Sequence, residues 1–114
     1  MAFGIQKQEL MRWKERVQAG DIAFITHYWF DPRFPQFQTV TKAGCADIEK
    51  LVRWGKHYRL KEQAIDRRNR FPHFDLMGAK QIEILVAEGL WDQIAQFSLA
   101  IPPLDQSYMG MDRG

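Results

Sequence analysis

The sequence predicts an α/β protein, a small single domain with a short parallel βαβ core flanked by N- and C-terminal helices. A chain of 114 residues is long enough for one hydrophobic core and too short for two. Its composition, 46% apolar and 26% charged, is typical of a globular protein. Apolar runs of strand length also alternate with segments of helical periodicity. We expect residues 1–97 to form the domain and residues 98–114 to form a flexible tail.

The N-terminal part of the chain predicts one helix and one buried strand. In residues 6–19, Leu10, Trp13 and Val17 recur at helical spacing, and Gly20 is suited to end the helix. Residues 22–25 are the continuous apolar run Ile-Ala-Phe-Ile, which predicts a strand covered on both faces. His27 follows at the point where this strand is expected to end.

The middle of the chain predicts a loop, a short strand and an amphipathic helix. Prolines disfavour regular structure in residues 30–38, and residues 39–41 predict a short edge strand. In residues 46–58 apolar side chains occupy one arc and basic side chains the opposite arc, which predicts a helix with a cationic outer face. Residues 64–65 fit either a second strand or one helical turn. A strand there would complete the parallel βαβ unit.

Two further helices are predicted after Pro72. Asp75 is well placed as the N-cap of a helix over residues 76–88, and Gly89 is suited to follow its last turn. Residues 90–97 predict a last short helix with several apolar side chains available for packing.

The charge of the chain is concentrated in its middle. The formal net charge is +2, yet residues 53–70 carry seven Lys or Arg against two acids, a local net charge of +5. The low overall charge excludes strongly basic nucleic-acid binders, whereas the local excess is compatible with an anionic ligand. The single cysteine, Cys45, excludes an internal disulfide. We find no signal-peptide core or membrane span, and expect a cytoplasmic protein without a membrane partner.

The predicted sheet places a candidate site at the carboxyl ends of its strands, where parallel α/β sheets bind ligands. This edge would gather His27, the start of the helix after Gly44, and the arginines of residues 67–75. That last stretch, Arg-Arg-Asn-Arg-Phe-Pro-His-Phe-Asp, combines cationic, imidazole and carboxylate side chains.

Four short motifs carry a resemblance to a known family. They are His-Tyr-Trp at 27–29, Gly-Cys-Ala-Asp at 44–47, Leu-Val-Arg-Trp-Gly at 51–55 and His-Phe-Asp-Leu at 73–76. Through them, residues 3–97 resemble the YneQ-like conserved hypothetical proteins of spore-forming bacteria. Residues 21–89 are more loosely similar to a broader bacterial family known as a domain of unknown function. The resemblance implies a small α/β protein and implies no activity.

The main hypothesis from the residues is a site for a phosphate-bearing small molecule or a nucleotide. Arg67 and Arg68 would supply forked donors, Lys42 a point charge, and the backbone N–H groups after Gly44 the positive end of a helix. Asp75 is also a candidate for ligand binding, although as a helix cap it would oppose a bound anion. The sequence contains no P-loop and no dinucleotide-binding glycine motif.

Two histidines are the candidate catalytic residues at this site. An imidazole titrates near neutral pH, so His27 or His73 could act as a general acid or base. The reaction, any cofactor and the oligomeric state stay open.

Three alternatives remain beside this hypothesis. One is a metal-dependent hydrolase using His27, Asp31, His73 and Asp75, which the nearby arginines disfavour unless a phosphate bridges the charges. Another is a nucleic-acid or protein-interaction module without catalysis, using the basic residues Lys50, Arg53, Lys56, Arg67, Arg68 and Arg70. The third is structural: His73 bonds a buried carbonyl, Asp75 caps a helix, and the arginines pair with Glu62 and Asp66.

Overall fold

The computed structural model describes residues 2–3, 5–33, 35, 38–68 and 70–99. Residues 100–114 of the predicted tail therefore lie outside the described residues. The helices and strands in chain order are β1 (Ala2–Phe3), α1 (Lys7–Gln18), β2 (Ala23–Trp29), β3 (Thr39–Gly44), α2 (Ile48–His57), the 3-10 turn η1 (Glu62–Ala64), β4 (His73–Leu76), α3 (Gly78–Ala87) and α4 (Trp91–Gln96). Within the described part, none of these helices is long and apolar enough to cross a membrane.

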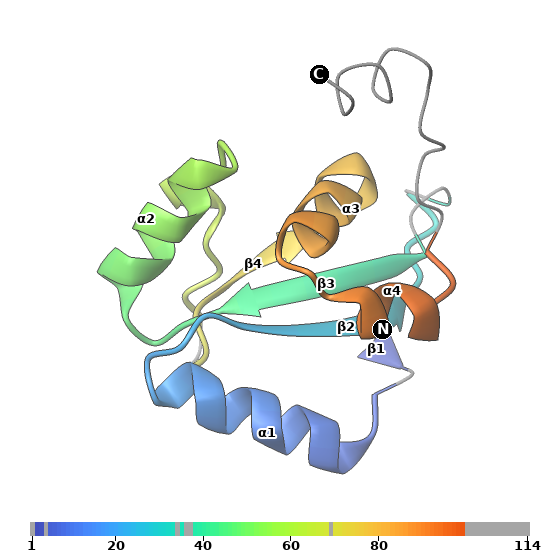
Figure 1. The fold of residues 1–114 in the computed structure, drawn as a ribbon, viewed down its shortest axis with the longest axis horizontal. Helices are drawn as coiled ribbons and strands as arrows, with labels where there is room; N and C mark the ends of the chain where they lie inside the picture. Colours follow the sequence, from blue (N-terminus) through green and yellow to red (C-terminus); the bar gives the residue numbers. More distant parts are fainter. Residues whose placement is uncertain (1, 4, 34, 36–37, 69, 100–114) are drawn as a thin grey trace, which may run out of the picture.

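The strands form one sheet in the order β1-β2-β3-β4, and every neighbouring pair is antiparallel. The mixed α/β class is confirmed, but the predicted parallel βαβ core is wrong. Residues 62–64 form the turn η1 instead of a strand, and β3 lies inside the sheet, not at its edge. The apolar run at residues 22–25 does reflect burial on both faces. Helices cover both faces of this antiparallel sheet (Figure 1). An apolar run buried on both faces therefore does not distinguish a parallel sheet from an antiparallel one.

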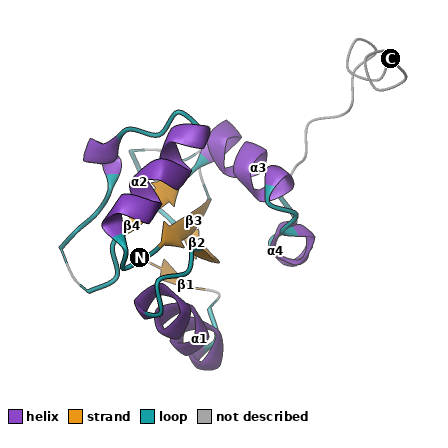
Figure 2. Ribbon diagram, turned by 60° about the vertical axis from the view of Figure 1, so that its left-hand side comes forward, coloured by secondary structure: helices purple, strands orange, loops and turns teal. Residues whose placement is uncertain are grey.

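The two faces of the sheet pack against different helices. Figures 1 and 2 show α1 on one side and α2 and α3 on the opposite side. The α1 side holds a small core of Trp13, Val17, Ala23 and Ile25. The opposite side holds a larger core of Ala43, Cys45, Leu51, Ile65, Phe74, Leu76 and Ile84. Most of the apolar burial therefore lies under α2 and α3, and the α1 side is more sparsely filled.

The predicted helices α1, α2 and α4 are confirmed within a few residues of their expected ends. The start of α3 is different, because it begins at Gly78 and Asp75 lies in β4. The N-cap prediction for Asp75 is therefore wrong. Phe74 and Leu76 both enter the larger core, and this period of two requires an extended chain through Asp75.

A chain of buried and partly buried hydrogen bonds joins the sheet to α3 and α4. The Gln93 Oε1 atom can only accept, so Thr26 Oγ1 donates to it, at 2.5 Å. Thr41 must then donate to Thr26, at 2.7 Å, while it accepts from Gln81 Nε2 at 3.0 Å. Thr39 donates to Gln81 Oε1 at 3.2 Å. Each donor thus has an acceptor, which removes the cost of burying these groups.

Two glycines allow close approach of helices to the sheet. A Cβ atom on Gly44 would lie 2.8 Å from Trp13 Cζ2, so the absence of a side chain lets α1 settle on β3. A Cβ atom on Gly55 would lie 2.6 Å from Phe74 Cζ, so α2 rests directly on the ring of a buried β4 residue. Both positions require glycine for space.

Replacing Gly55 by alanine should destabilise the protein. In an open helix this change stabilises by about 1 kcal/mol. Here the new methyl group meets Phe74, which is 1% exposed and has little room to move. We expect a loss of about 1–3 kcal/mol in the free energy of unfolding, measured by urea denaturation. Lys56→Ala, at the exposed neighbouring position, should change stability by less than about 0.5 kcal/mol. A Gly55→Ala protein as stable as the wild type would contradict the packing described.

Candidate functional site

Four of the candidate side chains lie on the α1 face of the sheet. Residues that pair directly across strands share a face, as do residues two apart along a strand. Lys42 pairs with Asp75, Gly44 pairs with His73, and Ile25 pairs with Lys42. His27 is two residues beyond Ile25 and takes the same face. The antiparallel register thus brings together His27, Lys42, His73 and Asp75. They lie on a face of the sheet, and not at the carboxyl edge that a parallel sheet would have offered.

A cavity of about 490 Å³ lies between this face and α1. Its walls come from α1, β2, β3 and the segment that leads into β4: Ile5, Leu10, Trp13, Lys14, Ile25, His27, Lys42, Arg70, Phe71 and His73. Three of the lining residues are Lys or Arg, and none of the described lining residues is acidic. The cavity therefore combines an apolar and aromatic wall with an excess of positive charge.

His27 contributes a buried acceptor that has no partner. Its Nδ1 atom lies 2.9 Å from the carbonyl oxygen of Tyr28. A carbonyl can only accept, so Nδ1 carries the proton and Nε2 the lone pair. His27 is 3% exposed, and Nε2 has no hydrogen-bond partner among the described residues. Burial lowers the pKa of His27 below its ordinary value of 6.5, and the positive charge of Lys42 acts in the same direction. The imidazole is neutral at pH 7.

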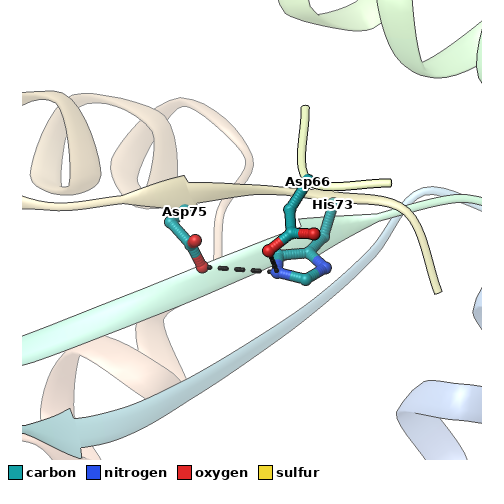
Figure 3. Close-up of side chains that lie close together, drawn as sticks. All are labelled: Asp66, His73 and Asp75. Carbon is teal, nitrogen blue, oxygen red and sulfur yellow. Dashed lines mark ion pairs between the residues drawn. The ribbon is translucent and has the colours of Figure 1, made fainter. Parts of the chain in front are cut away.

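His73 makes the same kind of contact through Nδ1 but has different neighbours at Nε2. Its Nδ1 atom donates to the carbonyl oxygen of Phe71 at 2.7 Å, as the structural alternative for this residue predicted. Its Nε2 atom faces two carboxylates, 3.5 Å from Asp75 Oδ1 and 3.9 Å from Asp66 Oδ2 (Figure 3). Asp66 reaches this position through an isolated antiparallel bridge with His73. The three side chains form the one group in the described part of the chain that could ligate a metal ion.

The two arginines expected to bind the ligand are paired with acids and do not line the cavity. Arg67 Nη2 lies 3.2 Å from Glu62 Oε2. Arg68 forks onto Asp66, with Nη2 2.7 Å from Oδ2 and Nε 3.1 Å from Oδ1. The hydrogen bonds from Arg68 hold the pKa of Asp66 well below its usual range. These pairs match the structural alternative for both arginines.

Two other parts of the predicted site have separate roles. The backbone N–H groups after Gly44 are occupied, because Cys45 donates to the Pro72 carbonyl at 3.0 Å and Ala46 to the Val17 carbonyl at 2.9 Å. Asp31, a candidate metal ligand, forms hydrogen bonds with Arg33 and lies outside the metal-capable group. The helix α2 begins at Ile48, and its N-cap Asp47 places a carboxylate there that accepts from the Lys50 N–H at 3.1 Å, which disfavours an anion at this terminus.

Sequence reasoning missed the contributions of Lys14, Trp13 and Asp66 to this region. Lys14 follows Trp13 in α1, and the helical spacing of Leu10, Trp13 and Val17 indicates only that Trp13 is buried. For Asp66 the sequence suggests only a pairing with an arginine. Its approach to His73 depends on a bridge between residues separated by a turn, for which the sequence has no periodic signal.

Comparison with known proteins identifies a relative. The chain is 57% identical over 99 residues to the Uncharacterized protein YneQ of Bacillus subtilis (strain 168). The match covers 87% of this chain and 100% of that protein. The chain belongs to the YneQ family. The resemblance found in the motifs is thereby confirmed. No family model matches, and no solved structure matches. The name of the YneQ relative states no activity, so the function must be argued from the site.

The neutral state of His27 predicts a pH-dependent stability. Between its lowered folded pKa and the unfolded value near 6.5, the unfolded chain binds more protons, so acidification favours unfolding. Stability should fall as the pH decreases through 6.5 and level off below the folded pKa. We would measure the free energy of unfolding by urea denaturation at pH 8 and at pH 5. His27→Gln should lose less of this free energy between the two pH values than the wild type does.

The matched control for this prediction is His57→Gln, because His57 is exposed in α2. That variant should keep the wild-type dependence on pH. The interpretation of His27 is wrong if His27→Gln and the wild type lose the same free energy of unfolding on acidification.

Proposed function

We propose that this YneQ-family protein binds a phosphate-bearing small molecule in the cavity between α1 and the sheet. The observation that carries the proposal is the composition of the cavity wall. Lys14, Lys42 and Arg70 line it without any acid among the described lining residues, and His27 adds a buried acceptor without a partner. A buried polar group without a partner costs stability, and a ligand that supplies the partner would remove this cost.

The cations fit the anionic group of the ligand. Lys42 extends from the centre of β3. Arg70 and Lys14 both lie over the ring of Phe71, with their charged groups 6.0 and 5.3 Å from its centre. Arg offers forked donors suited to phosphate oxygens, and Lys supplies a point charge. In this proposal Arg70 supplies the forked donors that the sequence suggested for Arg67 and Arg68.

The apolar wall and the volume fit an organic moiety. Trp13 and Phe71 present aromatic rings to the cavity, and its volume of about 490 Å³ lies in the usual range for small-molecule sites. A ligand that is only an inorganic anion would leave this wall uncovered. A phosphate ester of a small organic molecule, including a nucleotide, would use both parts.

His27 adds a requirement for a donor. Because its Nε2 carries a lone pair, it repels a fully ionised oxygen and accepts from a hydroxyl group. The ligand that suits the cavity therefore has a hydroxyl or a monoprotonated phosphate in addition to its negative charge. A neutral imidazole with a free lone pair is also the form that a general base needs, which supports His27 as a catalytic candidate. His73 stays the second candidate because it also lines the cavity.

The alternative of a nucleic-acid surface has less support from the described residues. Lys50 Nζ donates to the Gly20 carbonyl at 2.8 Å, and both Arg67 and Arg68 are paired with carboxylates. Three of the six basic residues considered for nucleic-acid binding are therefore already bonded to oxygen atoms of this chain. We further propose a cytoplasmic location, in keeping with the free and buried Cys45.

Removing the charge of Lys42 should weaken ligand binding. We would titrate the full chain with inorganic phosphate, ribose 5-phosphate and adenosine monophosphate by isothermal calorimetry. At least one of the two esters should bind more tightly than inorganic phosphate. Lys42→Met keeps most of the aliphatic stem and should reduce ester affinity about tenfold or more, the value of one charge-assisted hydrogen bond.

The control is Lys56→Met, an exposed lysine of α2, on the opposite side of the sheet from the cavity. It should bind as the wild type does. The proposal fails if none of the three ligands binds, or if Lys42→Met and Lys56→Met behave alike.

A further inference from the structure

We propose that Asp66, His73 and Asp75 form a binding site for a divalent transition-metal ion, such as Zn²⁺, beside the cavity. This inference goes beyond the proposed function, because it depends on different atoms and on a different ligand. The donor atoms are His73 Nε2 and one carboxylate oxygen each from Asp66 and Asp75, and they lie within 4.8 Å of one another (Figure 3).

The separations of these atoms fit a shared ion. Ligand atoms at about 2.0–2.2 Å from one tetrahedral Zn²⁺ lie roughly 3.3–3.6 Å apart. His73 Nε2 lies 3.5 Å from Asp75 Oδ1, which matches this separation, and 3.9 Å from Asp66 Oδ2, which a small side-chain rotation would shorten to it. Both distances exceed an ordinary hydrogen bond.

The orientation of His73 is a second, independent observation. The ring is 5% exposed, and Nδ1–H is bonded to the Phe71 carbonyl. Nε2 points toward the two carboxylates, 3.5 Å from Asp75 Oδ1 and 3.9 Å from Asp66 Oδ2. A positive charge placed between the two carboxylates and the ring would stabilise this arrangement. A backbone carbonyl that fixes the second nitrogen is also the usual support of a metal-bound histidine.

Asp66 is held independently of its salt bridge. The main-chain N–H of Arg68 donates to Asp66 Oδ1 at 3.0 Å, which orients the carboxylate toward His73. The Arg68 side chain is 88% exposed, so its contact with Oδ2 can be exchanged for a metal bond at little cost. Asp75 stands on the solvent side of the group, with 42% of its side chain exposed.

The chemistry of the three ligands favours a transition metal over Mg²⁺. Imidazole nitrogen suits Zn²⁺ and related ions, whereas Mg²⁺ prefers oxygen ligands throughout. Three protein ligands leave at least one position of the ion open to water or substrate. Because His73 also lines the cavity, that open position would adjoin the proposed phosphate site.

The test is metal titration of the full chain after treatment with a chelator, in a buffer without phosphate. We expect calorimetry with ZnCl₂ to show one ion bound per chain, and MgCl₂ to bind at least tenfold more weakly. The ¹⁵N shift of His73 Nε2 should move to the range of a metal-bound nitrogen. Asp75→Asn and Asp66→Asn should each weaken Zn²⁺ binding about tenfold or more.

Two matched controls make the result specific. Glu62→Gln removes a nearby exposed carboxylate outside the group, and His57→Gln removes an exposed imidazole, so both should bind Zn²⁺ as the wild type does. Lys42→Met should also retain Zn²⁺ binding, so the metal site and the phosphate site can fail separately.

A proton on His73 Nε2 is the other positive charge that could hold the three groups together. A His73 Nε2 that stays protonated with ZnCl₂ present would overturn the proposal in favour of a simple ion pair. Wild-type protein that binds no Zn²⁺ would overturn it, as would aspartate variants that bind as tightly as the controls.

Discussion

The contact between Trp13 and the sheet holds α1 against the strands and so bounds the cavity in which we propose that a ligand binds. The indole N–H donates to the Ala23 carbonyl at 3.0 Å, and the ring lies against the bare backbone of Gly44. This fixes α1 against the sheet at a distance that a larger residue at Gly44 would not allow. The cavity lies between α1 and this face of the sheet, and Leu10, Trp13 and Lys14 of α1 line it. The depth of the cavity therefore depends on how close the Trp13 contact holds α1 to the strands.

The opposite face shows a different balance of forces. There α2 and α3 bury the larger apolar core, and the threonine and glutamine chain closes the space between the strands and α3 and α4. Its donors and acceptors are matched one to one. On the α1 face, by contrast, His27 Nε2 has no partner in the described part of the chain, and His73 Nε2 faces acceptors. On the α2 side Trp54 Nε1 is also buried without a partner among the described residues, but the unmatched groups of the α1 face adjoin a cavity, as is expected at a site of function.

The success of the sequence-based predictions depended on the kind of signal. Helices α1 and α2 were predictable because their apolar residues repeat with the helical period. The direction of the strands was not, because a strand buried on both faces gives the same apolar run in either sheet. Asp75 followed a proline and preceded an apolar segment, as an N-cap does, yet alternation of Phe74 and Leu76 into the core overrode that local preference. Which residues form the candidate site was still harder to predict, because His27, Lys42 and His73 share one face of the sheet only through the register of three strands.

The antiparallel register also ties the site to the core on the far side of the sheet. In β4, His73 and Asp75 alternate with Phe74 and Leu76, which are each 1% exposed. If β4 shifted its pairing with β3 by one residue, each side chain would move to the opposite face of the sheet. Phe74 and Leu76 would leave the larger core, and His73 and Asp75 would enter it. Burial of Phe74 and Leu76 in the hydrophobic core therefore fixes the face of the sheet on which His73 and Asp75 lie. Substitutions in the core beneath α2, far from the cavity, will for this reason preserve the site only if Phe74 and Leu76 stay on the core side of β4.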